Sequence, residues 1–403
     1  MEPHDESRVR AAGRGPYVAV AASFLIHSTV SGTWAPRLPA IKESLDLSDG
    51  ELGTALVGLA IGLVVGTRLA GAPVDRFGSR PVMRAGFPLL AATLLLPGLA
   101  ESGVTLFAAL LVLGVASGAL DVAMNAQGIE VERHLGRPIL SGLHGLWSVG
   151  LGLGAGAAAI AAAVGADPLA HFAVIAAVLA LASLVFLGGL LAAAPPASDS
   201  EEPHTPVGWS VPLVLLGVIA FCSFVGEGSA SDWSAVYMTQ ELGTSEALGA
   251  VAFVAFAVTM ALARFGTDPL RARLDNVVLV RGGSLIAAAG LGIALLVHQP
   301  AAGILGFALL GLGLAPVVPI AFSAAGELDP RATGRLVGRV ATMGYVGSVA
   351  GPIMIGWLAD ATSLRASLCL VVALALVIAA SARTCSRAPQ PTQVMPKRSE
   401  AAA

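Results

Sequence analysis

The 403-residue sequence predicts an all-α integral membrane protein with twelve transmembrane helices in two parallel six-helix repeats. Three observations support this fold class. First, 56% of the residues are apolar and only 12% are charged, whereas soluble domains carry about 25% charged residues. Second, the apolar residues gather in runs of about 20, the length of a membrane-spanning helix. Third, the two halves of the chain repeat the same residues at a nearly constant distance.

Twelve apolar runs joined by short linkers account for most of the chain. A membrane β-barrel would instead show alternating segments of about ten residues, and these runs do not alternate. The predicted spans cover 16–36, 50–71, 82–99, 105–128, 139–164, 169–194, 211–238, 246–265, 277–297, 301–325, 339–359 and 363–382.

One longer linker, rich in Pro, Ser and acidic residues, divides the spans into two sets of six. It is too polar to cross a membrane. We therefore expect an N-terminal six-helix bundle over 1–194 and a cytoplasmic linker over 195–210. A C-terminal six-helix bundle follows over 211–382, and a disordered cytoplasmic tail over 383–403.

The two halves resemble each other at offsets of 196 to 199 residues. The matched residues lie in corresponding spans of the same orientation, so the repeat is parallel, as in one superfamily of secondary transporters. The pairs are Trp34 and Trp233, Arg68 and Arg264, Pro73 and Pro269, Arg84 and Arg281, Gly86 and Gly283, Gly114 and Gly313, Gly150 and Gly347, and Gly154 and Gly351.

The basic residues predict the orientation. All but three of the 23 Lys and Arg residues fall on the side that holds both chain ends, the exceptions being Arg37, Lys42 and Arg365. Positive residues favour the cytoplasmic side of a membrane. We therefore expect a multi-pass protein of the bacterial plasma membrane, the inner membrane of the cell, with both termini in the cytoplasm.

The connection between the second and third spans carries the first specific motif, Gly-Ala-Pro-Val-Asp-Arg-Phe-Gly-Ser-Arg at 71–80. It resembles the loop 2–3 motif of the major facilitator superfamily. The resemblance implies a cytoplasmic latch in which an aspartate faces a helix end of the other half, where a carboxylate is favoured. The alternative is that its arginines only fix topology and bind lipid headgroups. The latch residues are Gly71, Asp75, Arg76, Gly78 and Arg80.

Further stretches resemble the fucose–proton symporter group of this superfamily, and within it a largely unassigned bacterial branch. They are Trp-Ala-Pro-Arg-Leu-Pro at 34–39, Asp-Val-Ala-Met-Asn at 121–125, Gly-Leu-His-Gly-Leu-Trp at 142–147, Glu-Gly at 227–228 and Asp-Trp-Ser-Ala at 232–235. Sugar-carrying relatives also have an acid in the first span. Here that span offers the polar residues His27, Ser28, Ser31 and Thr33.

Asp121 is the leading candidate for a functional residue, because ionisable side chains inside a membrane are costly. Gly114, Gly118, Asp121 and Asn125 recur every three or four residues and share one helix face, which suits a cavity better than lipid. The symmetry-related position holds Ile320. The resemblance implies a carboxylate that carries the coupled proton, with Asn125 bonding substrate. The alternative is a carboxylate that only ties neighbouring helices together.

His144 is the second candidate. It lies about 8 Å inside the end of the fifth span, and Asp121 lies about 8 to 11 Å inside the end of the fourth. At matching depth the two could pair, and a histidine beside a carboxylate can exchange a proton near neutral pH. A packing histidine bonded to a backbone carbonyl is an equal alternative.

The seventh span presents a polar stripe of Glu227, Ser231 and Ser234. Asp232 lies off this stripe, and we expect it to form a structural pair with Arg37. We expect Asp121, His144 and Glu227 to couple protons. We expect substrate contacts from His27, Ser31, Asn125, His144, Glu227 and Ser231. For Trp34 and Trp233 we also considered a role as anchors at the membrane surface, as is common for aromatic residues.

These features predict a proton-coupled secondary transporter that moves a small polar solute by alternating access. The alternatives are a proton-driven efflux antiporter for a drug-like or metabolite substrate and, third, a transporter-like membrane receptor. No protease, hydrolase or nucleotide-binding motif is present, so we expect no enzyme activity, cofactor or metal. The expected partners are the solute, protons and the lipid bilayer, without nucleic acid, around a functional monomer.

Overall fold

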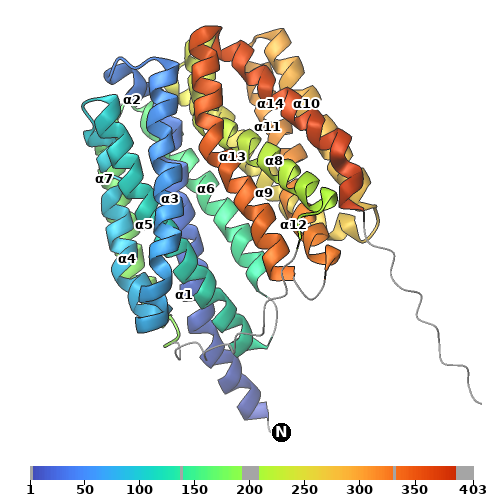
Figure 1. The fold of residues 1–403 in the computed structure, drawn as a ribbon. Coiled ribbons are helices and arrows are strands. Elements are labelled where there is room, and N and C mark those ends of the chain that lie inside the picture. The colour runs from blue at the N-terminus through green and yellow to red at the C-terminus, as the bar shows by residue number, and fades with distance from the viewer. Residues whose placement is uncertain (1–2, 137–138, 193–207, 330–332, 387–403) are drawn as a thin grey trace, which may run out of the picture.

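The computed structural model describes residues 3–136, 139–192, 208–329 and 333–386 (Figure 1). Over these ranges the chain is helical and contains no strand. Twelve of the helical segments are long and apolar enough to cross a membrane. The prediction of an all-α protein with twelve transmembrane helices is therefore confirmed. The expected linker at 195–210 and tail at 383–403 lie largely outside the described residues.

The N-terminal half supplies six spanning segments and a short helix, α2, that follows the first of them. Its elements are α1 (Pro3–Trp34), η1 (Ala35–Arg37), α2 (Leu38–Ser44), α3 (Asp49–Phe77), α4 (Ser79–Thr93), η2 (Leu96–Leu99), α5 (Gly103–Leu135), α6 (Leu140–Ala163), α7 (Pro168–Phe186) and η3 (Leu187–Gly189).

The C-terminal half supplies the other six spanning segments. Its elements are α8 (Val211–Val236), η4 (Tyr237–Glu241), α9 (Glu246–Arg271), α10 (Asn276–Val297), α11 (Pro300–Leu314), α12 (Val317–Leu328), α13 (Thr333–Ala361), α14 (Leu364–Ser381) and η5 (Ala382–Cys385).

Several helices begin or end some residues away from the predicted bounds, for example α3, α9 and α13, and the fourth and tenth spans show the physical reasons. The fourth continues to Leu135 as α5, seven residues beyond the expected end at 128, because its last turns remain good helix-forming sequence and stop only at Gly136, whose φ is +63°. The tenth is interrupted between α11 and α12 at Ala315 and Pro316, since proline has no N–H to continue the helix.

Local sequence explains where several helices begin. Ser48 and Ser102 accept backbone hydrogen bonds at the starts of α3 and α5, and Asp167 accepts two such bonds at the start of α7. These side chains satisfy N–H groups that have no partner inside the helix. At the other end of α3, Gly78 takes φ +81° and lets the chain turn directly into α4.

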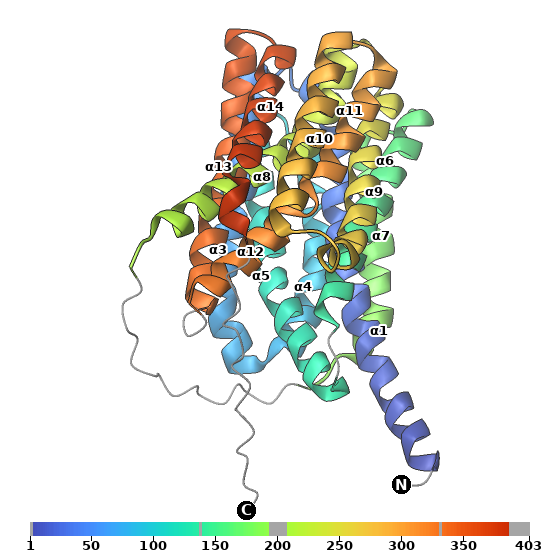
Figure 2. The same cartoon turned by 90° about the vertical axis from the view of Figure 1, so that its right-hand side faces the viewer.

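The sequence repeat reappears as repeated contacts. In the N-terminal half α6 packs on α1, and in the C-terminal half α13 packs on α8. Gly154 approaches the Thr29 carbonyl of α1, and Gly347 approaches the Phe221 carbonyl of α8. Close backbone approach of this kind is what small residues permit in membrane helix pairs. Figure 2 shows α6 beside α9 where the two halves meet.

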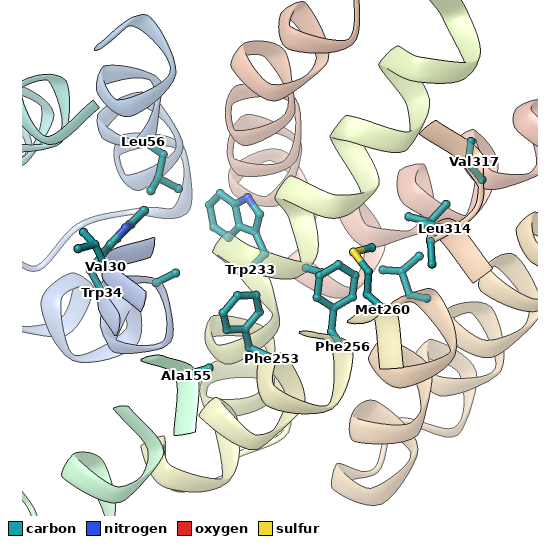
Figure 3. Packing of buried hydrophobic residues seen from close by; sticks show 14 of the residues in the cluster. Val30, Trp34, Leu56, Ala155, Trp233, Phe253, Phe256, Met260, Leu314 and Val317 are labelled. Carbon is teal, nitrogen blue, oxygen red and sulfur yellow. The ribbon is translucent and has the colours of Figure 1, made fainter. Parts of the chain in front are cut away.

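The halves join through α3 with α13 and α6 with α9. Buried apolar side chains of both halves form one cluster at this junction (Figure 3). Trp34 is 3% exposed and Trp233 is fully buried, and both lie near Phe253 in this cluster. The alternative role of the two tryptophans as surface anchors is therefore wrong, because neither reaches the outside of the bundle.

Two names describe the ends of the bundle. The termini side is the end from which α1 starts and near which α14 finishes, and the far side is the opposite end. Successive spans alternate between them. The far side therefore carries η1, α2, the start of α3 and the start of α9.

Candidate functional site

Ionisable and aromatic side chains from both halves come together inside the bundle. The N-terminal half contributes Asp121 and Asn125 from α5 and His144 from α6. The Asp121 carboxylate interacts electrostatically with His144, with His27 of α1 and with Tyr345 of α13. Side chains of the first, fifth and eleventh spans thus converge on one carboxylate of the fourth.

Asp121 has neutral partners. The Asn125 amide donates to the Asp121 backbone carbonyl at 2.8 Å and to its Oδ1 at 3.3 Å. Of the three ion pairs found between described residues, none includes Asp121. Both side chains are half-buried. The carboxylate is therefore placed to bind either a proton or a donor group of a solute.

His144 lies beside Asp121, as its depth predicted, and its side chain is exposed. Its ring packs edge-on against Phe24 of α1 at 5.4 Å between ring centroids. It also interacts electrostatically with Arg264 of the other half. This histidine therefore interacts with the carboxylate of Asp121 in its own half and with the guanidinium of Arg264 in the other.

Glu227 is compensated by a cation. Arg264 of α9 donates from Nη2 to Glu227 Oε2 at 3.1 Å. Ser223, one turn earlier on α8, donates to Glu227 Oε1 at 3.3 Å. The two charged side chains are 23% and 28% exposed, so the pair borders an accessible space. Tyr345 is exposed near the same centre and packs against Phe224 at 5.6 Å.

His27 is held by protein groups on both ring nitrogens. The indole N–H of Trp147 donates to Nδ1 at 3.3 Å. Because an indole can only donate, Nδ1 is the acceptor and Nε2 carries the hydrogen. Nε2 lies 3.1 Å from the Ser117 carbonyl oxygen and 2.9 Å from its hydroxyl. With 4% of the residue exposed, this geometry favours a role in joining α1, α5 and α6 over the expected substrate contact.

The two serines expected at the substrate are half-buried. Ser31 lies one turn beyond His27 on α1, and Ser231 lies one turn beyond Glu227 on α8. Ser234, the last member of the predicted stripe, is fully buried. The polar stripe therefore ends at Ser231.

The expected pairing of Asp232 with Arg37 is wrong. Arg37 donates from Nε to Glu246 Oε1 at 2.6 Å and from Nη2 to the Ala166 carbonyl at 2.6 Å. Its short 3-10 turn directs the guanidinium toward the start of α9, whereas Asp232 is buried on α8 one residue before Trp233.

The residues of the expected latch lie at the junction of α3 and α4. Gly71 and Arg76 lie in the last turns of α3, with the Arg76 guanidinium 5.1 Å from the centre of the Phe77 ring. Gly78 supplies the turn. Arg80 is the second residue of α4, and its Nε is buried without an acceptor among the described residues. The Asp75 side chain lies outside the description. The latch stays a prediction.

Ser79 stands where the family motif has a basic residue, and it is buried. Its hydroxyl donates to Gln127 Oε1 of α5 at 3.0 Å, and the Gln127 amide donates to the Leu191 carbonyl after α7 at 3.3 Å. These bonds stay within the N-terminal half. The serine that departs from the motif therefore helps to join α4, α5 and the segment after α7 within the N-terminal half.

Sequence reasoning missed Arg264 and Tyr345 as members of the site. Arg264 was counted among the basic residues that set topology, although the apolar run 246–265 already enclosed it. A cation inside a span, one helix away from an intramembrane glutamate, was the available signal. The described residues contain no cluster of three His, Cys, Asp or Glu side chains that could hold a metal ion.

Comparison with known families agrees with this architecture. The model of the Major Facilitator Superfamily matches residues 20–330 and 216–402, which together cover most of the chain. The chain belongs to the Major Facilitator Superfamily. It is therefore a membrane transport protein of the secondary-transporter type, and not an enzyme.

Its relatives are bacterial membrane proteins. An uncharacterised MFS-type transporter of Yersinia pestis is 36% identical over 93% of this chain and 97% of its own length. The uncharacterised transporter y4wD of Sinorhizobium fredii is 33% identical over 90% and 96%. The membrane protein MosC of Rhizobium meliloti is 29% identical over 90% and 88%.

Solved structures share the fold at low sequence identity. A mutant form of the nucleoside transporter NupG superposes with a TM-score of 0.72 at 12% identity, over 92% of this chain and 99% of NupG. FucP in its outward conformation gives a TM-score of 0.61 at 15% identity, over 94% of this chain and all of FucP. These likenesses concern the fold alone.

Proposed function

We propose that this transporter couples solute movement to protons, with Asp121 as the residue that binds the coupled proton. The observation that carries the proposal is the charge arrangement of the site. Glu227 is neutralised by Arg264, whereas Asp121 is bonded by the neutral amide of Asn125. An ionised carboxylate without a compensating cation is costly in a bundle of low polarity, so a proton bound to Asp121 changes the electrostatic energy of the site more than one bound to the paired Glu227 would.

Coupling requires that the solute bind the protonated and ionised forms of the site unequally, because only differential affinity shifts a conformational equilibrium. Asn125 lies one turn from Asp121 and can read the solute directly. His144 is exposed beside Asp121 and can share its proton. In the same proposal Glu227, Arg264, Ser31 and Ser231 bind the polar groups of the solute.

We further propose that the termini side faces the cytoplasm of a bacterial cell and that the protein works as a monomer. The distribution of Lys and Arg supports this orientation. A reporter fused to the carboxyl terminus that reads as periplasmic would contradict it.

The proton hypothesis is tested with Asp121→Asn, which keeps the shape of the side chain and removes its charge. A solute is first found with a thermal-stabilisation screen of the purified protein. Transport is then measured in proteoliposomes with and without an imposed pH gradient. We expect the variant to lose pH-driven accumulation by about tenfold or more, while exchange of solute across an equilibrated membrane partly survives, because binding and alternation do not need the proton.

The matched control is Asp167→Asn, which removes a carboxylate at the far-side start of α7. It should accumulate solute as the unmodified protein does. If Asp121→Asn still accumulates solute against its gradient when only pH drives it, Asp121 is not the coupling residue. Glu227→Gln would then be the next variant to assay.

A further inference from the structure

The far side of the bundle is closed by polar contacts between the halves. Besides the bond from Arg37 to Glu246, Lys42 donates from Nζ to Gln240 Oε1 at 2.7 Å. Ser48 donates to Asp360 Oδ2 at 2.9 Å. Each of these bonds links an element before residue 50 to one after residue 239. Together these bonds form a row along the far-side junction of the two halves, which we call the seam.

Arg37 is the most enclosed member of this row. It is 1% exposed, and its guanidinium joins three segments: η1, the connection between α6 and α7 through Ala166, and the start of α9 through Glu246. Removing one partner of a buried ion pair strongly destabilises the contact between the segments that it joins, because the other charge is left uncompensated.

Two further layers follow the row of polar contacts from the far side toward the termini side: an apolar layer and then the central site. From the far side, Arg37 of η1 is followed by Trp34 at the end of α1 and then by His27 of the central site. Along α9, Glu246 is followed by Phe253 and then by Arg264. The apolar layer of Trp34, Trp233 and Phe253 (Figure 3) therefore separates the charged seam from the site.

We propose that Arg37 and Glu246 form a lock that keeps the far side closed and must open once in each transport cycle. In the state described here the lock is engaged, so the central site is sealed on this side by the seam and by the apolar layer beneath it. The proposal rests on membership of the transporter family and does not depend on proton coupling at Asp121.

Two features make the lock releasable. The Nη1 atom of Arg37 is buried without an acceptor among the described residues, and such an unsatisfied donor lowers the net stability of the closed arrangement. Glu246, in contrast, is 24% exposed and lines a hollow of about 510 Å³ together with Lys42 and Gln240. Water therefore reaches the acceptor of the lock and can replace the guanidinium when the halves part.

The lock is tested by removing either partner in a protein whose three cysteines, Cys222, Cys369 and Cys385, have been replaced by alanine. Spin labels at positions 101 and 299, which are exposed on the far side in opposite halves, report its opening. Labels at 133 and 273 report the termini side. Distances within each pair are measured by double electron–electron resonance in nanodiscs without solute.

Arg37→Ala should raise the ratio of far-side-open to closed molecules about tenfold, with longer 101–299 distances and shorter 133–273 distances. Glu246→Gln should shift the ratio in the same direction but less, since the amide can still accept from Arg37. The double variant should be no more open than Arg37→Ala, because both changes remove one interaction.

The matched control is Arg365→Ala. Arg365 is another far-side arginine, but it donates to the Leu295 and Leu296 carbonyls within its own half. Its removal should leave both distance distributions unchanged. Unchanged distances in both Arg37→Ala and Glu246→Gln would overturn the lock, and so would equal opening in Arg365→Ala. Should Arg37→Ala fail to fold, Glu246→Gln alone decides between these outcomes.

Discussion

The two halves of this transporter share a scaffold but treat charge differently at their centre. In the N-terminal half, Asp121 is bonded to a neutral amide, and its symmetry-related position in the other half is the fully buried Ile320. In the C-terminal half, Glu227 is matched by Arg264. The two repeats therefore place different carboxylates in the site: the one in the C-terminal half is compensated by a cation, and the one in the N-terminal half is not.

Arg264 shows how the difference arose on equivalent positions. Its repeat partner Arg68 is exposed on α3 and lies toward the termini-side end of the second span. Arg264 occupies the same place on α9 but turns toward α8 and meets Glu227. Both halves therefore keep an arginine at the equivalent position. Whether that arginine takes part in the site depends on whether the neighbouring helix offers it a carboxylate.

The largest expected effect is a difference in stability between the same substitution at two equivalent glycines of the repeat. Gly154 and Gly351 correspond in the repeat, but a methyl group on Gly154 would collide with the Thr29 carbonyl, whereas one on Gly351 would find its nearest atoms at 3.6 Å. Gly154→Ala should lower the free energy of unfolding by about 3 kcal/mol, as overpacking does. Gly351→Ala should stay within about 0.5 kcal/mol of the unmodified protein.

Denaturant titration in detergent, followed by tryptophan fluorescence, measures both variants. Equal losses of stability would mean that the two glycines pack alike and that the contact with Thr29 is not what distinguishes them.

The second prediction concerns the compensated carboxylate. Arg264→Ala leaves Glu227 unpaired in a half-buried position and should cost about 2 kcal/mol, less than for a fully buried pair because both side chains keep some exposure. Adding Glu227→Gln should recover most of that loss, since no uncompensated charge remains. The melting temperatures of the single and double variants give the comparison.

Arg68→Ala is the control for the repeat, because it removes an exposed arginine from the equivalent position. Its melting temperature should be nearly unchanged. A double variant as unstable as Arg264→Ala would show that Arg264 stabilises the bundle through packing and not through its charge.

The sequence predicted the twelve spans and the parallel repeat because both depend on local properties. Long apolar runs leave a span no alternative to a helix in lipid, and small residues such as Gly154 permit close contacts between helices. The depth of Asp121 and His144 was also predictable, since both lie on regular helices of known rise. The structure brings those two side chains within electrostatic reach.

Partners across helices could not be predicted in the same way. Arg37 was paired with Asp232 because both lie near the far-side boundary, yet its guanidinium reaches Glu246 at the start of another helix. Trp34 and Trp233 were compared with surface anchors because periodicity does not tell which side of a helix faces the other half. These choices depend on helix rotation and packing, which a single sequence does not specify.

The smallest expected effect tests where the symmetry still holds. Arg84 donates to the Leu187 and Gly188 carbonyls at 3.1 and 2.7 Å, and Arg281 donates to the Ala379 carbonyl at 3.1 Å. Each arginine thus satisfies carbonyls at the end of the sixth span of its own half, where a cation is favoured. Arg84→Ala and Arg281→Ala should each cost about 1 kcal/mol, with the larger loss for Arg84 because it makes two bonds. Thermal unfolding of the two variants and of their combination should show additive losses, since the arginines lie in different halves. A strongly non-additive combination would mean that the two halves do not behave as independent copies of one scaffold even where their contacts match.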